Sequence, residues 1–311
     1  MTPKIAMVFP GQGSQSVGML KAYAGLPAIE ETLAEAGEVL GREFAQLLQE
    51  GPAEQLNLTV NTQPAMVTAG CAVYRAWLAL GGPKPAMVAG HSLGEYSALV
   101  AAGGLAFRDC LPLVRFRAQA MQEAVPAGQG AMAAILGLQD TEVQKACEEA
   151  GGIVQAVNFN SPEQTVIAGE KAAVERAIEK CKARGAKRAM PLPVSAPFHS
   201  SLMKPAGERL QGQLQKATLT APLIPVLNNV DVKVETRPDD IRHALVRQAY
   251  SPVRWVETIR RMKDEGVTDV IECGPGKVLA GMVKRISPEL RNHSLADRAS
   301  LEQALVAVKG G

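Results

Sequence analysis

Ser92 is the residue whose surroundings are best suited to chemistry. It lies in Gly90-His91-Ser92-Leu93-Gly94, a G-x-S-x-G pattern between an apolar stretch and a helical one. A sharp strand-to-helix turn would push the serine hydroxyl outward, and the glycines remove side chains that would clash there. The helix N-terminus would offer free N–H groups to an oxyanion. The pattern predicts a nucleophilic serine that accepts an acyl group.

The base for this serine has to come from four histidines. His91 adjoins the serine, and neighbours on a turn point in different directions, so we expect a packing or orienting role for it. His243 falls in a polar-rich helix and His293 in a polar C-terminal tail. His199 follows a proline-marked stretch at an expected lobe boundary, and it is the predicted base. No single residue among the 31 acids stands out as its partner.

Two backbone N–H groups are predicted to form the oxyanion hole. One belongs to Leu93, directly after the nucleophile. The other belongs to Gln12, in the glycine-rich loop Phe9-Pro-Gly-Gln-Gly-Ser-Gln15. A dinucleotide-binding turn would need glycine where the chain has Ser16, so that alternative is rejected.

Arg117 is out of place on its predicted helix, residues 110–125. At 100° per residue it falls near the middle of the apolar face. A buried guanidinium stays charged and needs an anion. Two alternatives remain open: a structural salt bridge, or a bidentate clamp for a carboxylate on the acyl group. In the second case Met121, one turn later, would line the acyl pocket, and simple lipase or esterase activity would be disfavoured.

Strand and helix patterns alternate along most of the chain, which predicts an α/β fold with a mainly parallel sheet. The middle differs, because its pattern reads strand, helix, strand, strand, helix, strand, the ferredoxin-like order. We expect residues 127–195 to form an inserted small domain and residues 1–126 and 196–311 the large one. The expected strands outside and inside the insert cover 4–9, 86–90, 130–138, 153–157, 165–168, 188–194, 224–227 and 268–273.

Composition narrows the function classes. Hydrophobic residues make up 47% of the 311, the net charge is +2, and aromatic residues are only 4%, so a nucleic-acid-binding surface is not expected. The five cysteines show neither metal-ligand spacing nor an even count, which favours buried free thiols in a reducing compartment. No stretch suits a signal peptide or a membrane span. We therefore expect a cytoplasmic protein without a membrane segment, and a monomer.

The chain resembles the malonyl-CoA:acyl carrier protein transacylases of bacterial type II fatty-acid synthesis over its whole length. Besides the loop at 9–15, Arg117 and Met121, the resemblance rests on Gly90-His-Ser-Leu-Gly-Glu-Tyr-Ser97, Gly130-Ala-Met-Ala133, Val157-Asn-Phe-Asn-Ser-Pro162, Pro197-Phe-His-Ser200, Asn228-Asn-Val230, Arg247-Gln248 with Ser251-Pro252, and Glu272-Cys-Gly-Pro-Gly-Lys277.

The resemblance implies an α/β-hydrolase-like large domain and ping-pong transfer of malonyl from malonyl-CoA to the phosphopantetheine thiol of acyl carrier protein, with no tightly bound cofactor. It implies a malonyl ester on Ser92, His199 as base and Arg117 as the carboxylate clamp. It also implies that Gln248 holds the histidine through a backbone carbonyl. Further expected cleft residues are Asn160, Ser200 and Phe198; the phenylalanine is similar to that of malonyl-selective polyketide synthase domains.

A basic cluster in the expected small domain could contact an acidic carrier protein. Its members are Lys180, Lys182, Arg184, Lys187 and Arg188. Such clusters are more often a solvated helix end. Three rival functions share part of the evidence: a thioesterase or esterase, a polyketide acyltransferase, and a non-catalytic binding subunit.

Overall fold

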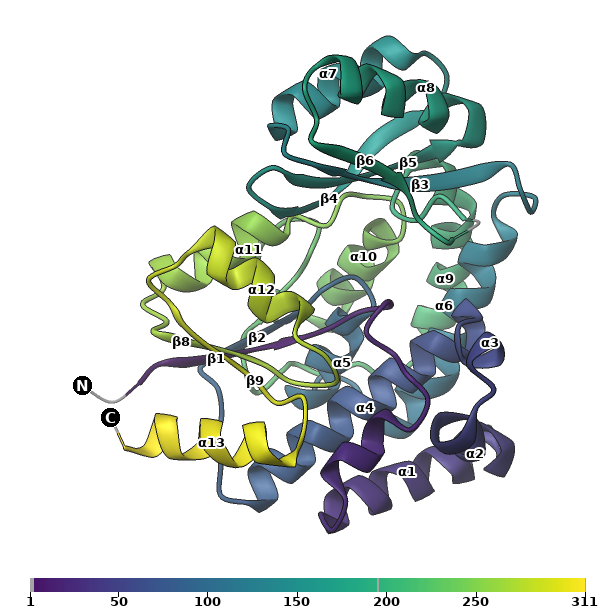
Figure 1. Cartoon of the computed structure of the whole chain (residues 1–311). Helices are drawn as coiled ribbons and strands as arrows, with labels where there is room; N and C mark the ends of the chain where they lie inside the picture. The colour runs from purple at the N-terminus through teal and green to yellow at the C-terminus, as the bar shows by residue number, and fades with distance from the viewer. Residues whose placement is uncertain (1–2, 195, 311) are drawn as a thin grey trace.

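The computed structural model describes residues 3–194 and 196–310 and contains two lobes (Figure 1). The large lobe is built on a five-stranded sheet in the order β7-β2-β1-β8-β9, in which every neighbouring pair is parallel. Its strands are β1 (Ile5–Phe9), β2 (Met87–Gly90), β7 (Val226–Leu227), β8 (Asp269–Glu272) and β9 (Arg291–Ser294).

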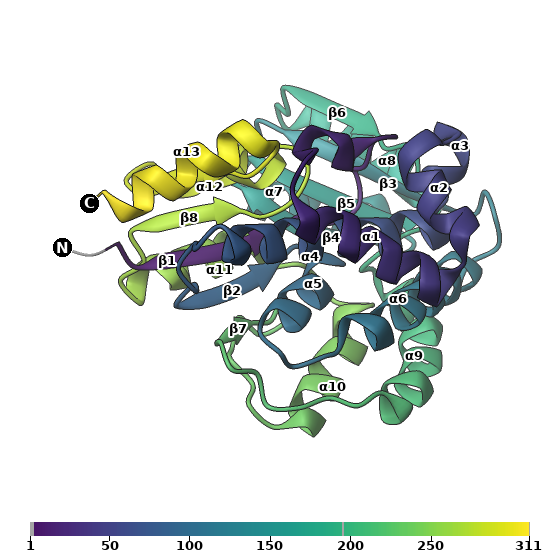
Figure 2. The same cartoon turned by 90° about the horizontal axis from the view of Figure 1, so that it is seen from below.

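Alternate side chains of the parallel strands enter two different cores. Met7 and Phe9 pack with Val88 against helices on one face, whereas Val8 and Ala89 pack against helices on the other. Figure 2 shows α1, α4 and α5 on the first face, and α11 and α12 supply the second core. Burial on both faces explains why these strands appear in the sequence as continuous apolar runs.

The helices of the large lobe are η1 (Met19–Tyr23), α1 (Pro27–Leu40), α2 (Arg42–Glu50), α3 (Ala53–Leu56), α4 (Thr59–Ala79), α5 (Gly94–Ala101), α6 (Phe107–Glu123), η2 (Ser201–Met203), α9 (Lys204–Lys216), α10 (Pro238–Gln248), α11 (Trp255–Asp264), α12 (Val278–Ile286) and α13 (Arg298–Lys309). None of the helices in residues 3–194 and 196–310 is both long and apolar enough to cross a membrane.

The small lobe is built on a separate antiparallel sheet, in the order β4-β5-β3-β6. One face of this sheet packs on two helices, and the other face, with Met132 and Val157, packs toward Phe198 and the large lobe (Figure 1). Its elements, in the predicted order, are β3 (Gly130–Leu136), α7 (Asp140–Ala150), β4 (Val154–Ser161), β5 (Gln164–Glu170), α8 (Lys171–Ala183) and β6 (Arg188–Pro191). The predicted α/β class with a mainly parallel sheet is confirmed.

One prediction about the C-terminal region was wrong. The stretch expected to be a polar tail contains the edge strand β9. Its Arg291 donates two hydrogen bonds to the carboxylate of Asp269 on β8, at 2.9 and 2.7 Å, and His293 lies 3.2 Å from the same group. Asp269 is almost completely buried. The strand lacks an apolar pattern because none of its side chains is buried, and two of them, Arg291 and His293, contact this carboxylate.

Candidate active site

The turn that carries Ser92 can form only because of its glycines. Ser92 has φ +52°, in the left-handed region that few non-glycine residues adopt. A Cβ atom on Gly90 would lie 1.8 Å from the carbonyl carbon of Gly94, and one on Gly94 would lie 2.1 Å from the carbonyl oxygen of Phe9. β1 and β2 pair Phe9 with Gly90, which places this turn at the carboxyl edge of the sheet. The G-x-S-x-G spacing is thus a packing requirement.

His199 is positioned to take the proton of Ser92. Its Nε2 lies 2.6 Å from Ser92 Oγ, and its Nδ1 lies 2.9 Å from the backbone carbonyl oxygen of Gln248. A carbonyl only accepts, so Nδ1 carries the hydrogen and Nε2 presents a lone pair to the hydroxyl. Burial, followed by the nearby Arg117 charge, lowers the pKa of His199 to about 3. The imidazole is therefore neutral at pH 7, as a general base must be.

Arg117 on α6 is buried beside this pair and is held by neutral groups. Its Nη1 donates to Gln63 Oε1 at 2.8 Å, and its Nη2 donates to Gln248 Oε1 at 2.9 Å. Nη2 also lies 3.4 Å from Ser92 Oγ, and Nε has no partner within the described chain. The guanidinium forms no salt bridge with any residue in 3–194 and 196–310. Of the two alternatives from the sequence, the structural ion pair is therefore not found among the described residues.

Behind the turn, two amide side chains and one carboxylate fix the backbone around Ser92. Asn229 Oδ1 accepts from the Ser92 N–H at 2.7 Å, and its Nδ2 donates to the Gly90 carbonyl at 2.7 Å. Gln248 Nε2 donates to the Ser92 carbonyl and to Glu95 Oε2, each at 2.9 Å. Glu95 also accepts the Asn229 N–H at 3.0 Å. Burial raises the pKa of Glu95 to about 7.

Asn229 and Glu95 carry no individual signal in the sequence. Both stand inside stretches that support the family resemblance, 90–97 and 228–230. Their contacts with the turn connect residues more than a hundred positions apart. Sequence spacing cannot reveal such contacts.

The loop after β1 reaches the turn at close range. A Cβ on Gly11 would lie 2.6 Å from the carbonyl oxygen of His91, so only glycine permits this approach. Gln12 Nε2 donates to Thr59 Oγ1 at 3.0 Å and anchors the loop to α4. Across residues 3–194 and 196–310, the backbone N–H groups of Gln12 and Leu93 have no hydrogen-bond partner. Both residues border the Ser92 cavity, and both N–H groups are available to an oxyanion.

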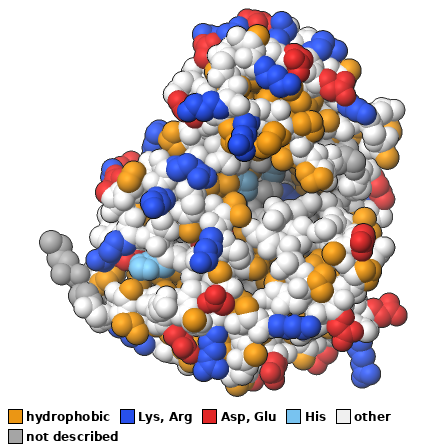
Figure 3. Space-filling model, in the orientation of Figure 1, with side chains coloured by type: hydrophobic (Ala, Val, Ile, Leu, Met, Phe, Trp, Pro, Cys, Tyr) orange, Lys and Arg blue, Asp and Glu red, His pale blue; other side chains and the backbone are white. Residues whose placement is uncertain are grey.

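The cavity at Ser92 has a volume of about 140 Å³ and lies between the lobes. Figure 3 shows the hollow between the two lobes, with histidine and basic side-chain atoms in its floor. Six of the predicted residues, besides Ser92, line it: Gln12, Leu93, Arg117, Met121, Phe198 and His199. Lining residues that the sequence did not single out are Gln63, Met132, Asn158, Leu192 and Val194.

Three predicted residues are not on the cavity wall. Asn160 is buried, and its Oδ1 lies 2.7 Å from His91 Nε2, which ties the turn to β4; the expectation for His91 as an orienting residue agrees with this contact. Ser200 is buried and donates to the Pro197 carbonyl at 2.7 Å, inside the loop that carries the base. Gln248 is fully buried and accepts a hydrogen bond from Arg117 Nη2. Asn160 Oδ1 and the Ser200 hydroxyl are thus engaged by His91 and by the Pro197 carbonyl, and the expected cleft contacts of these two residues stay predictions.

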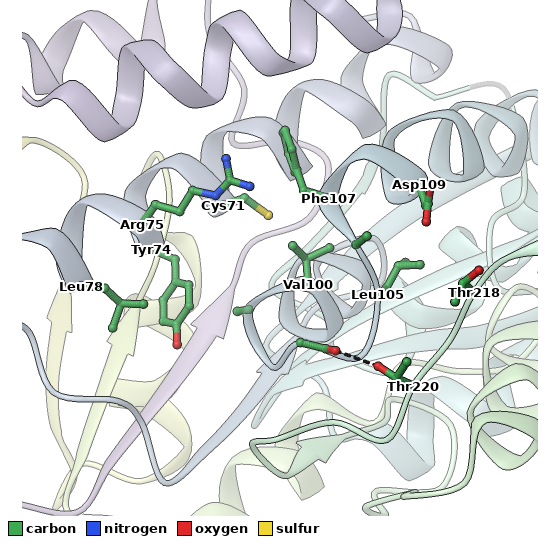
Figure 4. Close-up of a pocket in the computed structure, with 13 residues that line it drawn as sticks. Cys71, Tyr74, Arg75, Leu78, Val100, Leu105, Phe107, Asp109, Thr218 and Thr220 are labelled. Carbon is green, nitrogen blue, oxygen red and sulfur yellow. Dashed lines mark hydrogen bonds between the residues drawn. The ribbon is translucent and has the colours of Figure 1, made fainter.

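A larger cavity, of about 410 Å³, lies between α4, α6 and the loop before β7 (Figure 4). Burial raises the pKa of its Cys71 to about 12, which suppresses the thiolate. Its Arg75 is paired with Glu35 at 2.7 Å. No histidine of the described chain lines it. This cavity lacks a nucleophile with a base, so we place the candidate active site at Ser92.

The basic cluster of the small lobe is mostly remote from the Ser92 cavity. α8 packs on the sheet face opposite to the cavity, and there Lys182 pairs with Glu179 at 2.8 Å. Arg184 pairs with two glutamates of α7 at 2.5 Å. Lys187, just before β6, and Arg188, the first residue of β6, are exposed.

The chain is similar to known proteins over nearly its whole length. Residues 6–300 match the acyl transferase domain family. The malonyl CoA-acyl carrier protein transacylase of Escherichia coli K12 is 57% identical over 305 residues, which cover 97% of this chain and 99% of that protein. The acyl-carrier-protein S-malonyltransferase of Burkholderia pseudomallei 1710b is similar in structure, with a TM-score of 0.96 at 61% identity over 97% of this chain and 99% of that one.

A further similar structure is PlMCAT:AntF, a type II PKS acyl-carrier protein in complex with its malonyl-transacylase. Its TM-score is 0.96, with 52% identity over 98% of this chain and 99% of that one. These likenesses extend over nearly the whole chain and include the strand-turn-helix that carries Ser92. The chain belongs to the malonyl CoA-acyl carrier protein transacylase family.

Proposed function

We propose that this protein transfers the malonyl group from malonyl-CoA to the phosphopantetheine thiol of acyl carrier protein through a malonyl ester on Ser92. The observation that carries the proposal is a buried cation beside an activated serine: Arg117 Nη2 lies 3.4 Å from Ser92 Oγ, and His199 Nε2 lies 2.6 Å from the same oxygen. A thioester with a free carboxylate on its acyl group would satisfy all three side chains.

In the first half-reaction, Ser92 Oγ attacks the thioester carbon while its proton moves to His199 Nε2. The oxyanion receives hydrogen bonds from the N–H groups of Gln12 and Leu93. The carbon–sulfur bond then breaks, and coenzyme A leaves as the thiol with the proton from His199. The Gln248 carbonyl keeps the imidazole in one tautomer during both transfers.

In the second half-reaction, the phosphopantetheine thiol gives its proton to His199 Nε2 and its sulfur attacks the ester carbon. The ester carbon–oxygen bond breaks, and Ser92 recovers its proton. Arg117 holds the acyl group in one orientation, which favours attack by the positioned thiol over attack by water.

Arg117 also links substrate binding to the base. Its charge is the second cause of the low pKa of His199, after burial. A bound carboxylate would offset that charge, so the imidazole becomes easier to protonate when a malonyl group is present. An acetyl group cannot have this effect.

The proposal includes the finer architecture. Residues 1–126 and 196–311 would form an α/β-hydrolase-like catalytic domain, and residues 127–195 a ferredoxin-like insert. The serine turn at the carboxyl edge of the parallel sheet supports the first description. The order β3-α7-β4-β5-α8-β6 with the sheet order β4-β5-β3-β6 supports the second.

We further propose a monomeric cytoplasmic enzyme without a tightly bound cofactor. The five cysteines are buried and free, which fits a reducing compartment. The most exposed large apolar residues, Leu223 and Val306, lie apart in a loop and in α13 rather than in one surface patch. Light scattering at several protein concentrations tests the monomer.

The decisive experiment for the function is intact-protein mass spectrometry after brief exposure to malonyl-CoA. Wild type should gain one malonyl group, Ser92→Ala none, and the adduct should disappear from wild type when holo acyl carrier protein is added. An adduct that persists with the carrier protein but decays in buffer would instead indicate a thioesterase. No adduct at all would refute the acyl donor or the nucleophile.

A further inference from the structure

The partners of Arg117 are unusual for a buried cation. Arg117 is 1% exposed, and a guanidinium in such surroundings normally has a carboxylate against it. Here the two shorter hydrogen bonds go to glutamine side-chain oxygens, Gln63 Oε1 on α4 at 2.8 Å and Gln248 Oε1 on α10 at 2.9 Å, and a third contact, at 3.4 Å, goes to the neutral hydroxyl of Ser92. These oxygens accept hydrogen bonds from the guanidinium, as carboxylate oxygens would, but they carry no negative charge.

The two glutamines are held differently. The Nε2 of Gln248 donates to the Ser92 carbonyl and to Glu95, which sets the orientation of its amide. This places the nearest buried carboxylate, Glu95, behind Gln248 rather than on the guanidinium. Gln63 accepts from the other terminal nitrogen of Arg117, Nη1, borders the cavity and is 2% exposed. It is thus the acceptor that shares the cavity with an acyl group.

An acid in place of Gln63 would change the charge without changing the shape. Glutamate is isosteric with glutamine, and its carboxylate would keep the contact to Nη1. It would neutralise the cation locally and would repel an acyl carboxylate in the same small cavity. Glutamine keeps the guanidinium fixed and leaves its charge available for the substrate.

We infer that Gln63 is a specificity-determining residue. Its uncharged oxygen orients Arg117 toward the acyl carboxylate, so that this carboxylate is the first anion to contact the guanidinium. The inference rests on the proposed function, because it presupposes that the cavity takes a carboxylated acyl group. It concerns substrate choice and assigns Gln63 no part in proton transfer.

The test compares Gln63→Glu with Gln63→Met, using kcat/KM for serine acylation by malonyl-CoA and by acetyl-CoA. Gln63→Glu should lower kcat/KM for malonyl-CoA about a hundredfold or more, because of Coulomb repulsion in a buried site. The factor by which it lowers kcat/KM for acetyl-CoA should be at least about thirty times smaller. Gln63→Met removes one hydrogen bond but keeps the cation, so its malonyl loss should be about tenfold. Gln211→Glu, an exposed position on α9, is the matched control and should not alter the ratio.

Each outcome decides the matter. An unchanged malonyl-to-acetyl ratio in Gln63→Glu, or an equal change in Gln63→Met, would overturn the inference, because charge would then not be the determinant. If Gln63→Glu does not fold, competitive inhibition by malonate is measured on wild type and Gln63→Met. A malonate affinity within about tenfold of wild type supports the inference, and any larger loss refutes it. If the wild type never loads malonyl, the proposed function is refuted as well. If the wild type loads malonyl, the variants test only the role of Gln63.

Discussion

The buried state of His199 predicts a specific pH dependence of stability. Its pKa is about 3 in the folded chain against 6.5 for the ordinary side chain. Between these values the unfolded chain binds a proton that the native chain does not, so the free energy of unfolding falls as the pH falls. At about 1.4 kcal/mol per pH unit, the full loss approaches 5 kcal/mol by pH 3. From pH 7 to pH 5 it amounts to about 2 kcal/mol.

Urea unfolding of wild type and His199→Asn at several pH values between 7 and 5 measures this contribution. The variant should lose about 2 kcal/mol less than wild type over that range, whatever its stability at pH 7. The difference between the two slopes is the informative quantity, because Glu95 and Glu272 titrate in both proteins. Their raised pKa values, each about 7, act in the opposite direction and weaken the fold as the pH rises toward 7.

His243→Asn is the matched control, since it removes an imidazole from an exposed position on α10. It should keep the slope of wild type. Parallel slopes in wild type and His199→Asn would show that the native imidazole is not held neutral by its surroundings. The reasoning from burial and from the charge of Arg117 would then be wrong.

Three further predictions concern the clamp, the turn and the partner. Arg117→Met should slow serine acylation by malonyl-CoA at least thirtyfold, because it removes about 2–5 kcal/mol of buried charge pairing, and it should affect acetyl-CoA far less; equal losses in stopped-flow acylation would contradict the clamp. Gly94→Ala should lower the free energy of unfolding, measured with urea, by about 3 kcal/mol, since its Cβ would lie 2.1 Å from a carbonyl oxygen. Gly212→Ala, whose Cβ would have no atom within 4 Å, should be neutral or stabilising. Similar effects of the two changes would refute the packing argument. Reversing the charges of Lys187 and Arg188 together should raise the KM for acyl carrier protein without changing malonyl-CoA loading, and an unchanged KM in the steady-state assay would remove them from the docking surface.

A structural constraint could be predicted from the sequence wherever only one residue type satisfies it. Gly90 and Gly94 have to be glycine because main-chain atoms would overlap any Cβ, and this constraint appears in the sequence as a fixed spacing around Ser92. The continuous apolar strands were predictable because both faces of the parallel sheet are buried. Arg117 was detectable because a charge on an apolar helix face conflicts with the pattern.

Contacts between distant segments were decided only by the tertiary structure. Asn160 and Ser200 were expected at the cleft, and the structure shows that Asn160 Oδ1 contacts His91 and that the Ser200 hydroxyl donates to the Pro197 carbonyl. Strand β9 was missed because none of its polar side chains is buried, and two of them contact a carboxylate on the neighbouring strand.

The sequence by itself determined the chemistry: a serine on a glycine-framed turn, one well-placed histidine and a cation on an apolar face. These signals are local, because they arise from backbone sterics and helical periodicity. The tertiary structure decided which neutral oxygens hold Arg117, how Gln248 and Asn229 fix the turn, and which side chains form the cavity. Those facts depend on packing between segments such as α4, α6 and α10, and hydrogen bonds across such distances leave no pattern along a single chain.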